Sequence, residues 1–460
     1  MRRLGTALLI TALLLLGAPA APAHSAPDGF TATEVSFTGN GGVVLHGTVL
    51  TPAAAPPAGT TRRPGIVMLE GAGNRGRSYL RPEAEAYARH GIVTLFYDKR
   101  SVGYSLLHRD YSVLADDALA GIRLLRDRPD VDPARLGLWA LSEGAFVAPI
   151  AANRSTDVTF LITVGAVGTT VAAQTAWAYG TYLRHAGVRG SMPRIMQTTA
   201  VRATIAMGLF AEAGFDPVPA WQQVRQPVLA QWGQLDRDSV PRRSSELIGA
   251  ALDHGGNTRH TIRVVAGTNH NLHRTAHDGF DRLPVLPADY ADYETAWIAD
   301  PPYDAAMVGA VLADEPAVPV VTGSTWAYFG VALAMVGAFA GYLLAGVGRR
   351  IRGGVRGRSS RAARWLVALA PVTVAGTCVV MLFLLATAAK VPGPVILGRP
   401  LVWLALQLLA VATVAAAVGV AATWRHRGGL GPAERIRLGL LTAGGALFVV
   451  WAVQWGLLLP

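Results

Sequence analysis

Apolar and polar positions divide the chain into two parts with different periodicities. In the first part, short apolar runs alternate with segments in which apolar residues recur every three or four positions. Strands that alternate with helices predict a mostly parallel sheet with helices on both faces. The predicted strands are residues 65–69, 91–97, 136–140, 158–164, 227–232 and 261–266. The predicted helices are residues 81–90, 111–126, 145–152 and 242–252, and a β-hairpin with an Asn-Gly turn precedes them at residues 33–51.

The second part of the chain consists of four long apolar runs. They cover residues 326–347, 366–389, 401–424 and 438–459. Each run is long enough to cross roughly 30 Å of hydrocarbon, so we predict four transmembrane helices within residues 325–460. No charged residue lies in the middle of a run, which argues against an ion or proton pathway. Anchoring is the simplest role, and lipid binding or assembly remain alternatives.

The first 23 residues have the pattern of a targeting segment. Met1-Arg2-Arg3 precedes the apolar run Leu4 to Leu16, and the small-residue site Ala21-Pro22-Ala23 follows. This arrangement predicts a secretory signal peptide over residues 1–23, and an uncleaved anchor is the alternative. In either case residues 24–324 are expected to be exported.

The formal net charge of +11 is unevenly distributed. From residue 325 onward there are 13 basic residues and one acidic residue, whereas residues 24–324 hold 26 basic and 29 acidic residues. The basic charge therefore belongs to the membrane part and gives no support for nucleic-acid binding. Because Cys378 is the only cysteine, no disulfide can form within the chain.

The loops between the apolar runs differ in positive charge. Arg349 to Arg364 contains seven arginines and Arg425 to Arg437 contains four, but the loop between them has only Lys390 and Arg399. By the positive-inside rule, both arginine-rich loops are cytoplasmic. The first run then enters the membrane from outside, which places residues 24–324 on the extracytoplasmic side.

Ser142 is placed where a strand gives way to a helix. It is the centre of Ala140-Leu141-Ser142-Glu143-Gly144, after the apolar run from Leu136 and before a helix-compatible segment. This variant of G-x-S-x-G is typical of a nucleophile elbow, in which a strained serine between small residues presents its hydroxyl beyond the sheet. Alanine in place of the first glycine is the mildest change, because it adds only a methyl group.

Two further residues with catalytic potential follow later strands. Asp236 comes just after the strand at 227–232, and His270 comes just after the strand at 261–266. The carboxyl ends of parallel strands meet at one edge of a sheet, so these side chains are expected near Ser142. The order Ser142, Asp236, His270 is the order of the triad in α/β-hydrolases.

Residues 35–297 resemble the α/β-hydrolase superfamily, in particular bacterial serine hydrolases of the prolyl-oligopeptidase-like or carboxylesterase-like kind. The motifs that carry the resemblance are Tyr97 to Ser105 (YDKRSVGYS), Asp130 to Gly144, Gly233 to Asp236 and Gly267 to His270. The chain departs from the family pattern at Ala140, at Ser101 and at Glu70, where many members have glycine, glycine and histidine. The resemblance implies an α/β-hydrolase fold with a helical cap, at about residues 168–220, over a mostly parallel sheet with flanking helices.

The triad implies nucleophilic catalysis. Ser142 would attack an acyl carbonyl, His270 would act as general base and Asp236 would orient the imidazole. We expect the oxyanion hole to consist of the backbone N–H groups of Ala72 and Glu143, with the Glu143 side chain solvated. The nearest substitutes for the acid and the base are Asp238, His273 and His277. No cofactor and no metal is implied.

Two other interpretations compete for some of these residues. Gly71 to Gly76 matches G-x-G-x-x-G, and Asp98 ends the next strand, as in a dinucleotide-binding fold. In a hydrolase the same glycines would let the chain approach the reacting carbonyl, and Asp98 and Arg100 would make structural contacts in a loop. His273 and His277, four residues apart, could share a helix face as metal ligands, although no third ligand is apparent.

The aromatic and methionine side chains of the cap have two possible roles, a substrate pocket or plain packing. They are Trp177, Tyr179, Tyr182, Met192, Met196, Met207 and Phe210.

The sequence therefore predicts an exported serine hydrolase tethered to a membrane, which cleaves ester or other acyl bonds. Its expected partners are a small-molecule or peptide acyl substrate and the lipid bilayer, and nucleic acid is not among them. The alternatives are a serine peptidase and a catalytically idle sensor or scaffold with a hydrolase fold.

Overall fold

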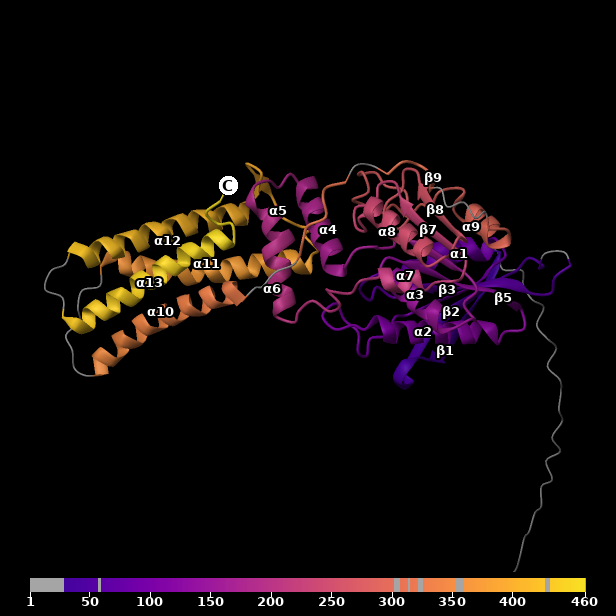
Figure 1. Ribbon diagram of the computed structural model, residues 1–460, viewed down its shortest axis with the longest axis horizontal. Helices are drawn as coiled ribbons and strands as arrows, with labels where there is room; N and C mark the ends of the chain where they lie inside the picture. Colours follow the sequence, from indigo (N-terminus) through magenta and orange to yellow (C-terminus); the bar gives the residue numbers. More distant parts are fainter. Residues whose placement is uncertain are drawn as a thin grey trace, which may run out of the picture.

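The computed structural model describes residues 29–56, 59–301, 307–312, 315–321, 326–351, 360–426 and 431–459. The predicted signal peptide lies outside these residues. Figure 1 shows a sheet domain at one end of the molecule and a group of long helices at the other, with shorter helices between them. The shorter helices are α4 (Val171–His185), α5 (Ser191–Ile195) and α6 (Val201–Ala206), which we call the α4–α6 helices.

A nine-stranded sheet, counted over the described residues, has the order β1-β2-β4-β3-β5-β6-β7-β8-β9. β1 and β2 form the predicted hairpin, β2 also pairs antiparallel with β4, and the remaining neighbours are parallel. The strands are β1 (Phe30–Thr38), β2 (Val44–Pro52), β3 (Arg63–Leu69), β4 (Val93–Tyr97), β5 (Val131–Leu141), β6 (Leu161–Val164), β7 (Val228–Gly233), β8 (His260–Val265) and β9 (Met307–Gly309). This order confirms the predicted α/β-hydrolase fold, and within this sheet only the short edge strand β9 was not expected from the sequence. A separate antiparallel pair, β10 (Val395–Ile396) and β11 (Arg399–Pro400), was not expected either.

The strands are apolar on both sides because helices cover both faces of the sheet. In β3, Val67 and Leu69 pack in one hydrophobic core, and Ile66 and Met68 pack in the other. The first core contains residues of α2 (Tyr111–Arg126), α3 (Gly144–Arg154), α7 (Val218–Gln222) and α8 (Pro241–His254). The second contains residues of α1 (Arg81–Arg89) and α9 (Tyr290–Ala299).

The dinucleotide-binding interpretation is wrong. The antiparallel β2 lies beside β4, and the helix after the glycine-rich turn begins only at Arg81, after a 3₁₀ turn (Arg77–Leu80). The Asp98 carboxylate accepts a hydrogen bond from the backbone N–H of Arg77 at 2.8 Å. Asp98 therefore closes the turn itself, as the structural interpretation of this residue expects.

Four long apolar helices follow the sheet domain, as predicted. They are α10 (Trp326–Ile351), α11 (Arg361–Ala386), α12 (Leu401–His426) and α13 (Pro432–Gln454), and each is long and apolar enough to cross a membrane. α10 packs on α13, α11 packs on α12, and α12 packs on α13. Small residues allow close packing: a Cβ atom on Gly445 would lie 2.8 Å from that of Ala417. We call these four helices the bundle.

A buried ion pair connects three separate segments of the sheet domain. Arg100, in the loop after β4, binds both carboxylate oxygens of Asp117 on α2, at 2.6 and 2.7 Å. The guanidinium also donates to the carbonyl of Asn40 in the β1–β2 turn, at 2.8 Å. Both charged side chains are less than 10 % exposed: 7 % for Arg100 and 1 % for Asp117. The predicted structural role of Arg100 is thus explained by the hairpin that it holds against α2.

We expect Asp117→Asn to lower the thermal stability of the full chain in detergent. Breaking a buried pair leaves an uncompensated charge, which typically costs about 3–5 kcal/mol. The matched control is Asp116→Asn, since the Asp116 side chain is 40 % exposed and pairs at the surface with Arg154. A surface pair contributes about 0–1 kcal/mol, so the control should unfold close to the wild-type temperature. Equal losses in the two variants would contradict this interpretation of the buried pair.

Candidate active site

Ser142 has the backbone conformation of a nucleophile elbow. It lies between β5 and α3 with φ of +52°, in the left-handed region that residues other than glycine rarely occupy. A Cβ atom on Gly144 would lie 2.7 Å from the carbonyl oxygen of Leu69, so this position requires glycine. Ala140 is fully buried in β5, and its methyl group fits there. The elbow therefore accommodates alanine at position 140, but position 144 requires glycine.

Asp236 and His270 are brought together by the turns after β7 and β8. The His270 Nδ1 atom lies 2.8 Å from the Asp236 Oδ2 atom, and both residues are buried. The two turns touch: a Cβ atom on Gly233 would lie 2.0 Å from the carbonyl oxygen of Asn269. Glycine at position 233 is therefore a condition for this hydrogen bond.

Asp236 is held as a carboxylate by several donors. Its Oδ1 atom accepts hydrogen bonds from the N–H groups of Asp238 at 2.8 Å and Ser239 at 3.0 Å, and Oδ2 accepts from the Ser239 hydroxyl at 2.5 Å. Burial by itself would raise the pKa of the Asp236 carboxyl, but the His270 charge and these hydrogen bonds outweigh burial and lower it. The residue is therefore ionised wherever the protein is folded near neutral pH.

His270 lies over the turn next to Ser142. A Cβ atom on Gly165 would lie 2.5 Å from the His270 Cε1 atom, and Gly165 directly follows Val164, whose carbonyl accepts from the N–H of Ser142 at 2.9 Å. Burial lowers the pKa of the imidazole, but the charge and hydrogen bond of Asp236 outweigh burial and raise it. The structure thus gathers Ser142, Asp236 and His270 at the carboxyl edge of β5 to β8.

The glycine-rich turn after β3 lies against the serine. A Cβ atom on Gly71 would lie 3.4 Å from the Ser142 Cβ atom, and Ala72 follows with an exposed side chain. The N–H of Gly73 donates to the Tyr104 hydroxyl at 3.0 Å. The turn that carries the Ala72 amide is therefore adjacent to the elbow that carries the Glu143 amide.

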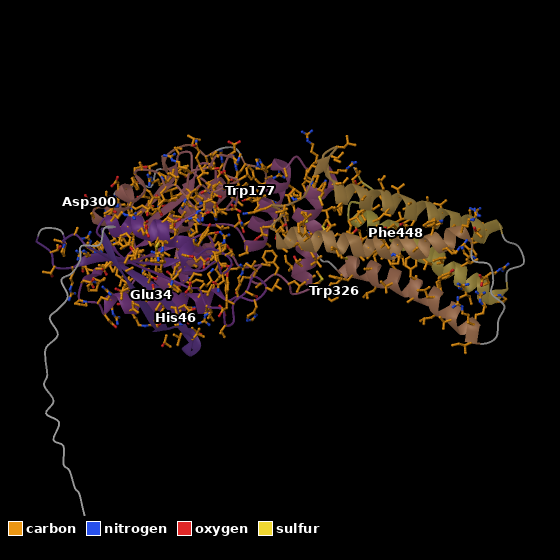
Figure 2. The ribbon with its side chains drawn as sticks, turned by 180° about the vertical axis from the view of Figure 1, so that it is seen from behind. Glu34, His46, Trp177, Asp300, Trp326 and Phe448 are labelled. Carbon is orange, nitrogen blue, oxygen red and sulfur yellow. The ribbon has the colours of Figure 1, made fainter. Side chains whose placement is uncertain are left out.

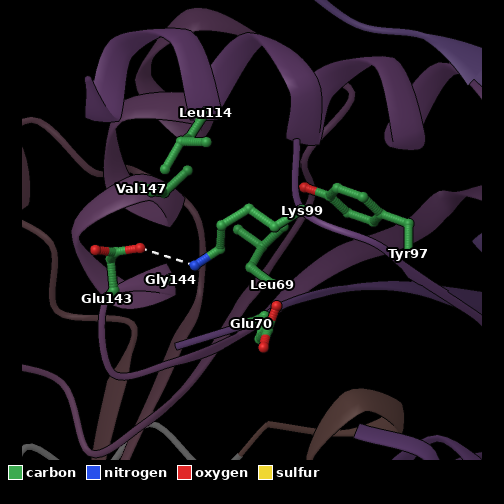
Figure 3. A pocket seen from close by; sticks show the side chains of 8 residues that line it. All are labelled: Leu69, Glu70, Tyr97, Lys99, Leu114, Glu143, Gly144 and Val147. Carbon is green, nitrogen blue, oxygen red and sulfur yellow. Dashed lines mark hydrogen bonds and ion pairs between the residues drawn. The ribbon is translucent and has the colours of Figure 1, made fainter. Parts of the chain in front are cut away.

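The expectation of a solvated Glu143 side chain is wrong. Glu143 is 3 % exposed, and its carboxylate accepts from Lys99 at 2.8 Å, from Tyr104 at 2.6 Å and from Arg109. Figure 3 shows Lys99 extending from the loop after β4 toward this carboxylate. The loop folds over the start of α3, so it covers a side chain that would otherwise face water.

Lys99 connects the two turns. Besides binding Glu143, its ammonium group donates to the carbonyl of Gly71, the residue before Ala72. Burial would raise the pKa of Glu143, but the charges of Lys99 and Arg109 outweigh burial and lower it. Burial raises the pKa of the neighbouring Glu70, although Lys99 opposes this. Sequence reasoning noted Lys99 only as part of the YDKR motif and did not identify this contact.

A small cavity lies beside this network, and its volume is about 20 Å³. That is room for one water molecule and too little for an acyl substrate. Figure 3 shows the lining side chains, which are Leu69, Glu70, Tyr97, Lys99, Leu114, Glu143, Gly144 and Val147.

The substitute residues lie in different places. The Asp238 carboxylate accepts from the Tyr182 hydroxyl at 3.0 Å and does not touch His270 through a hydrogen bond among the described residues. His273 is fully buried and pairs with Glu83 at 2.7 Å, while His277 is exposed. The two histidines lie in a non-helical loop, so the expectation of a shared helix face is wrong.

One group in the described part of the chain has the composition of a cation site. Ligand atoms of Asp236, Asp238 and His270 all lie within 4.8 Å of one another. His270 Nδ1 and Asp236 Oδ2 are already hydrogen-bonded to each other, so a cation would have to replace that bond.

Most of the aromatic and methionine side chains of the predicted cap are packing residues. Tyr179, Met192 and Met196 belong to one hydrophobic core with residues of the bundle, and the Trp177 indole N–H donates to the carbonyl of Pro316 at 2.9 Å. Figure 2 shows Trp177 between the sheet domain and the bundle, in which Phe448 lies. No local pattern signals this shared core, because its members come from two segments, residues 172–213 and 335–457, that are separated by more than 100 residues.

Comparison with known proteins gives short matches. No protein-family model matches the chain. A polyketide transferase of Penicillium crustosum is 35% identical over 85 residues, which are 18% of this chain and 28% of that protein. A thiohydrolase of Arthrinium phaeospermum is 32% identical over 135 residues, 28% of this chain and 42% of that protein. The chain thus spans less than half the length of these curated relatives.

Solved structures with a similar fold include esterases and peptidases. An esterase of Pyrococcus furiosus is 16% identical with a TM-score of 0.39, and the match covers 53% of this chain and 85% of that one. A puromycin-hydrolyzing peptidase of Mycobacterium tuberculosis is 20% identical with a TM-score of 0.39, over 54% of this chain and 37% of that one. The strand order itself gives this chain an α/β-hydrolase fold, which four apolar helices follow.

Proposed function

We propose that the chain is an exported, membrane-tethered serine hydrolase that cleaves ester or other acyl bonds. The observation that carries the proposal is the Asp236–His270 hydrogen bond at the same sheet edge as the left-handed Ser142. An acid that orients an imidazole beside a strained serine is the arrangement that activates a hydroxyl nucleophile.

The chemistry follows from the hydrogen bond of the imidazole. Because Nδ1 is bonded to Asp236, Nε2 is the ring nitrogen left to accept the Ser142 proton. The Ser142 oxygen then attacks the acyl carbon, and His270 returns the proton to the departing alcohol or amine. Water, deprotonated by His270, releases the acid from the acyl-enzyme and restores the serine.

The backbone N–H groups of Ala72 and Glu143 are the proposed oxyanion donors. Their turns touch beside Ser142, and Lys99 binds the carbonyl of Gly71 as well as the Glu143 side chain. Preorganised donors stabilise the charge that develops on the carbonyl oxygen, and each one typically contributes about 3 kcal/mol. Lys99 is therefore proposed as a positioning residue for both donors.

The proposed orientation rests on the position of the arginines. Figure 1 shows the end of α10 and the start of α11 at the end of the bundle far from the sheet domain. Arg349 and Arg350 end α10, and Arg361 begins α11. If this end is cytoplasmic, the sheet domain is on the extracytoplasmic side, as the proposed signal peptide also requires.

We expect a fluorophosphonate probe to label one residue, Ser142, in the full chain. Labelling should disappear in Ser142→Ala and persist in Ser101→Ala, since Ser101 is an exposed loop residue. Mass spectrometry of the labelled peptide identifies the site. An unlabelled wild-type protein would instead support the idle sensor or scaffold.

Turnover of p-nitrophenyl esters, measured beside turnover of aminoacyl amides, then separates esterase from peptidase activity.

The rate should rise with pH as His270 loses its proton. Because its pKa is raised above the ordinary value of 6.5, the midpoint of the rise should lie above pH 6.5. Asp236→Asn removes the charge that raises the pKa, so burial prevails and the midpoint should move down. The same change should lower kcat by about 10⁴-fold, because the imidazole loses its orienting partner.

The control for this pH profile is Asp238→Asn. Asp238 also raises the pKa of His270 but does not orient the ring. We expect a smaller downward shift of the midpoint with kcat largely kept. Identical profiles of the Asp236 and Asp238 variants would exclude the assigned triad.

The positioning role of Lys99 can be tested with a matched pair, Lys99→Met and Arg109→Met. Both variants remove one ion pair to Glu143, but only Lys99 also binds Gly71. Loss of one oxyanion donor typically lowers kcat by about 10²–10³-fold, so Lys99→Met should approach this loss with little change in KM. Arg109→Met should lower kcat much less at a similar cost in thermal stability. Equal kcat values for the two variants would mean that Lys99 acts only on stability.

A further inference from the structure

The bundle is packed against the α4–α6 helices, and α4 contacts Asp238 beside the proposed triad through Tyr182. Leu183, Met192 and Ile195 of the α4–α6 helices share one hydrophobic core with Trp451 and Leu457 at the C-terminal end. In Figure 1 the α4–α6 helices lie between the bundle and the sheet domain. The bundle therefore does more than tether the sheet domain to a membrane, because the α4–α6 helices bury part of their apolar surface against it.

Polar contacts fix this packing in one register. The N–H of Arg189, just after α4, donates to the carbonyl of Gly398 in the α11–α12 loop at 2.7 Å. The Ser191 hydroxyl donates to the carbonyl of Gly456, after α13, at 2.7 Å. A Cβ atom on Gly456 would lie 2.9 Å from the Ser191 Cβ atom. Backbone contacts this close leave no space for the helices to slide.

A lysine in the loop between α11 and α12 contacts the residues next to the triad. The Lys390 Nζ atom, in the α11–α12 loop, lies 3.7 Å from the Asp238 carboxylate and 4.5 Å from the centre of the Tyr182 ring. The Asp238 N–H donates to the Asp236 carboxylate, which binds His270. Only two residues, Asp238 and Asp236, therefore separate Lys390 in the α11–α12 loop from the His270 imidazole.

Exposed apolar side chains surround this junction. They are Met207 (48 %) and Leu209 (40 %) after α6, and Val391 (53 %), Ile396 (46 %) and Leu397 (86 %) in the α11–α12 loop. If the bundle spans the bilayer, apolar side chains at its end lie at the boundary between headgroups and acyl chains, into which apolar faces are buried by about 5–10 Å. The α11–α12 loop, which contacts Asp238 beside the triad, would then be at the depth where a lipid carries its ester bonds.

We propose that the substrate is an amphiphilic acyl ester that resides in the bilayer and presents its ester at the α11–α12 loop. This inference rests on the proposed hydrolase function and adds the class of substrate. The Ser142 oxygen takes the acyl group, the lipid alcohol leaves with the proton from His270, and water then releases the fatty acid. A bundle that only anchored the domain would need none of the contacts of Arg189, Ser191 or Lys390.

Surface dilution in vesicles tests the proposal. The full chain is reconstituted in vesicles of a dialkyl ether phosphatidylcholine, which has no ester bond, together with a 4-methylumbelliferyl hexadecanoate ester, and more of the ether lipid is then added at constant ester and protein. If the ester is taken from the bilayer below saturation, a tenfold dilution should lower the rate about tenfold. Hydrolysis of the water-soluble butyrate ester should not change.

A matched pair of variants locates the entry point. Leu397 has φ of +53°, a conformation that asparagine adopts readily, so Leu397→Asn removes the apolar side chain with little strain. We expect this variant to hydrolyse the hexadecanoate ester about fivefold more slowly and the butyrate ester at the wild-type rate. The control is Val44→Asn, another exposed apolar position (57 %) on β2 of the sheet domain, which should change neither rate.

The outcomes separate this inference from the hydrolase function. If butyrate is hydrolysed but dilution leaves the hexadecanoate rate unchanged, the substrate does not come from the bilayer and the inference is wrong. The inference is also wrong if Leu397→Asn and Val44→Asn hydrolyse the hexadecanoate ester at the same rate. If neither ester is hydrolysed and Ser142 is unlabelled, the hydrolase function itself fails.

Discussion

The approach of the β7 and β8 turns is the contact on which the proposed chemistry depends. Gly233 lets the backbone at Asn269 come close enough for the Asp236 carboxylate to meet His270 Nδ1. The pair is buried, so each partner needs the other: the carboxylate is stabilised by the imidazole, and the imidazole gains a raised pKa from the carboxylate. Parallel strands then place Ser142 at the same edge, because β5 and β7 both pair with β6.

The sequence predicted the elements that local patterns determine. Short apolar runs predicted the strands. Ser142, Asp236 and His270 were predicted as site residues because each follows the end of a strand, and parallel strands end at one edge of the sheet. It did not predict the burial of Glu143. Its partners Lys99 and Arg109 lie 44 and 34 residues away, in a loop whose path no local pattern determines. The sequence alone does not distinguish a glutamate after the serine that faces solvent from one that is buried in an ion-pair network.

The same limit applies to the junction with the bundle. Each apolar run was recognisable as a helix by its length, but a run of leucine, valine and alanine does not say which face packs on which neighbour. From the sequence, Met192 and Met196 were equally compatible with a substrate pocket and with plain packing, and the structure shows that they pack with bundle residues such as Trp451. Long-range packing of this kind needs three-dimensional information, since nothing periodic in the sequence encodes it.

The contacts at the junction also explain why a single apolar helix would not suffice for this packing. The α4–α6 helices present apolar side chains to the C-terminal residues after α13 and backbone partners to the α11–α12 loop. A single helix at α10 would supply neither surface, and Met192, Ile195 and their neighbours would face water at a cost of about 2 kcal/mol for each large side chain. The four helices therefore provide the surface against which the α4–α6 helices are held, and with them Tyr182, whose hydroxyl donates to Asp238.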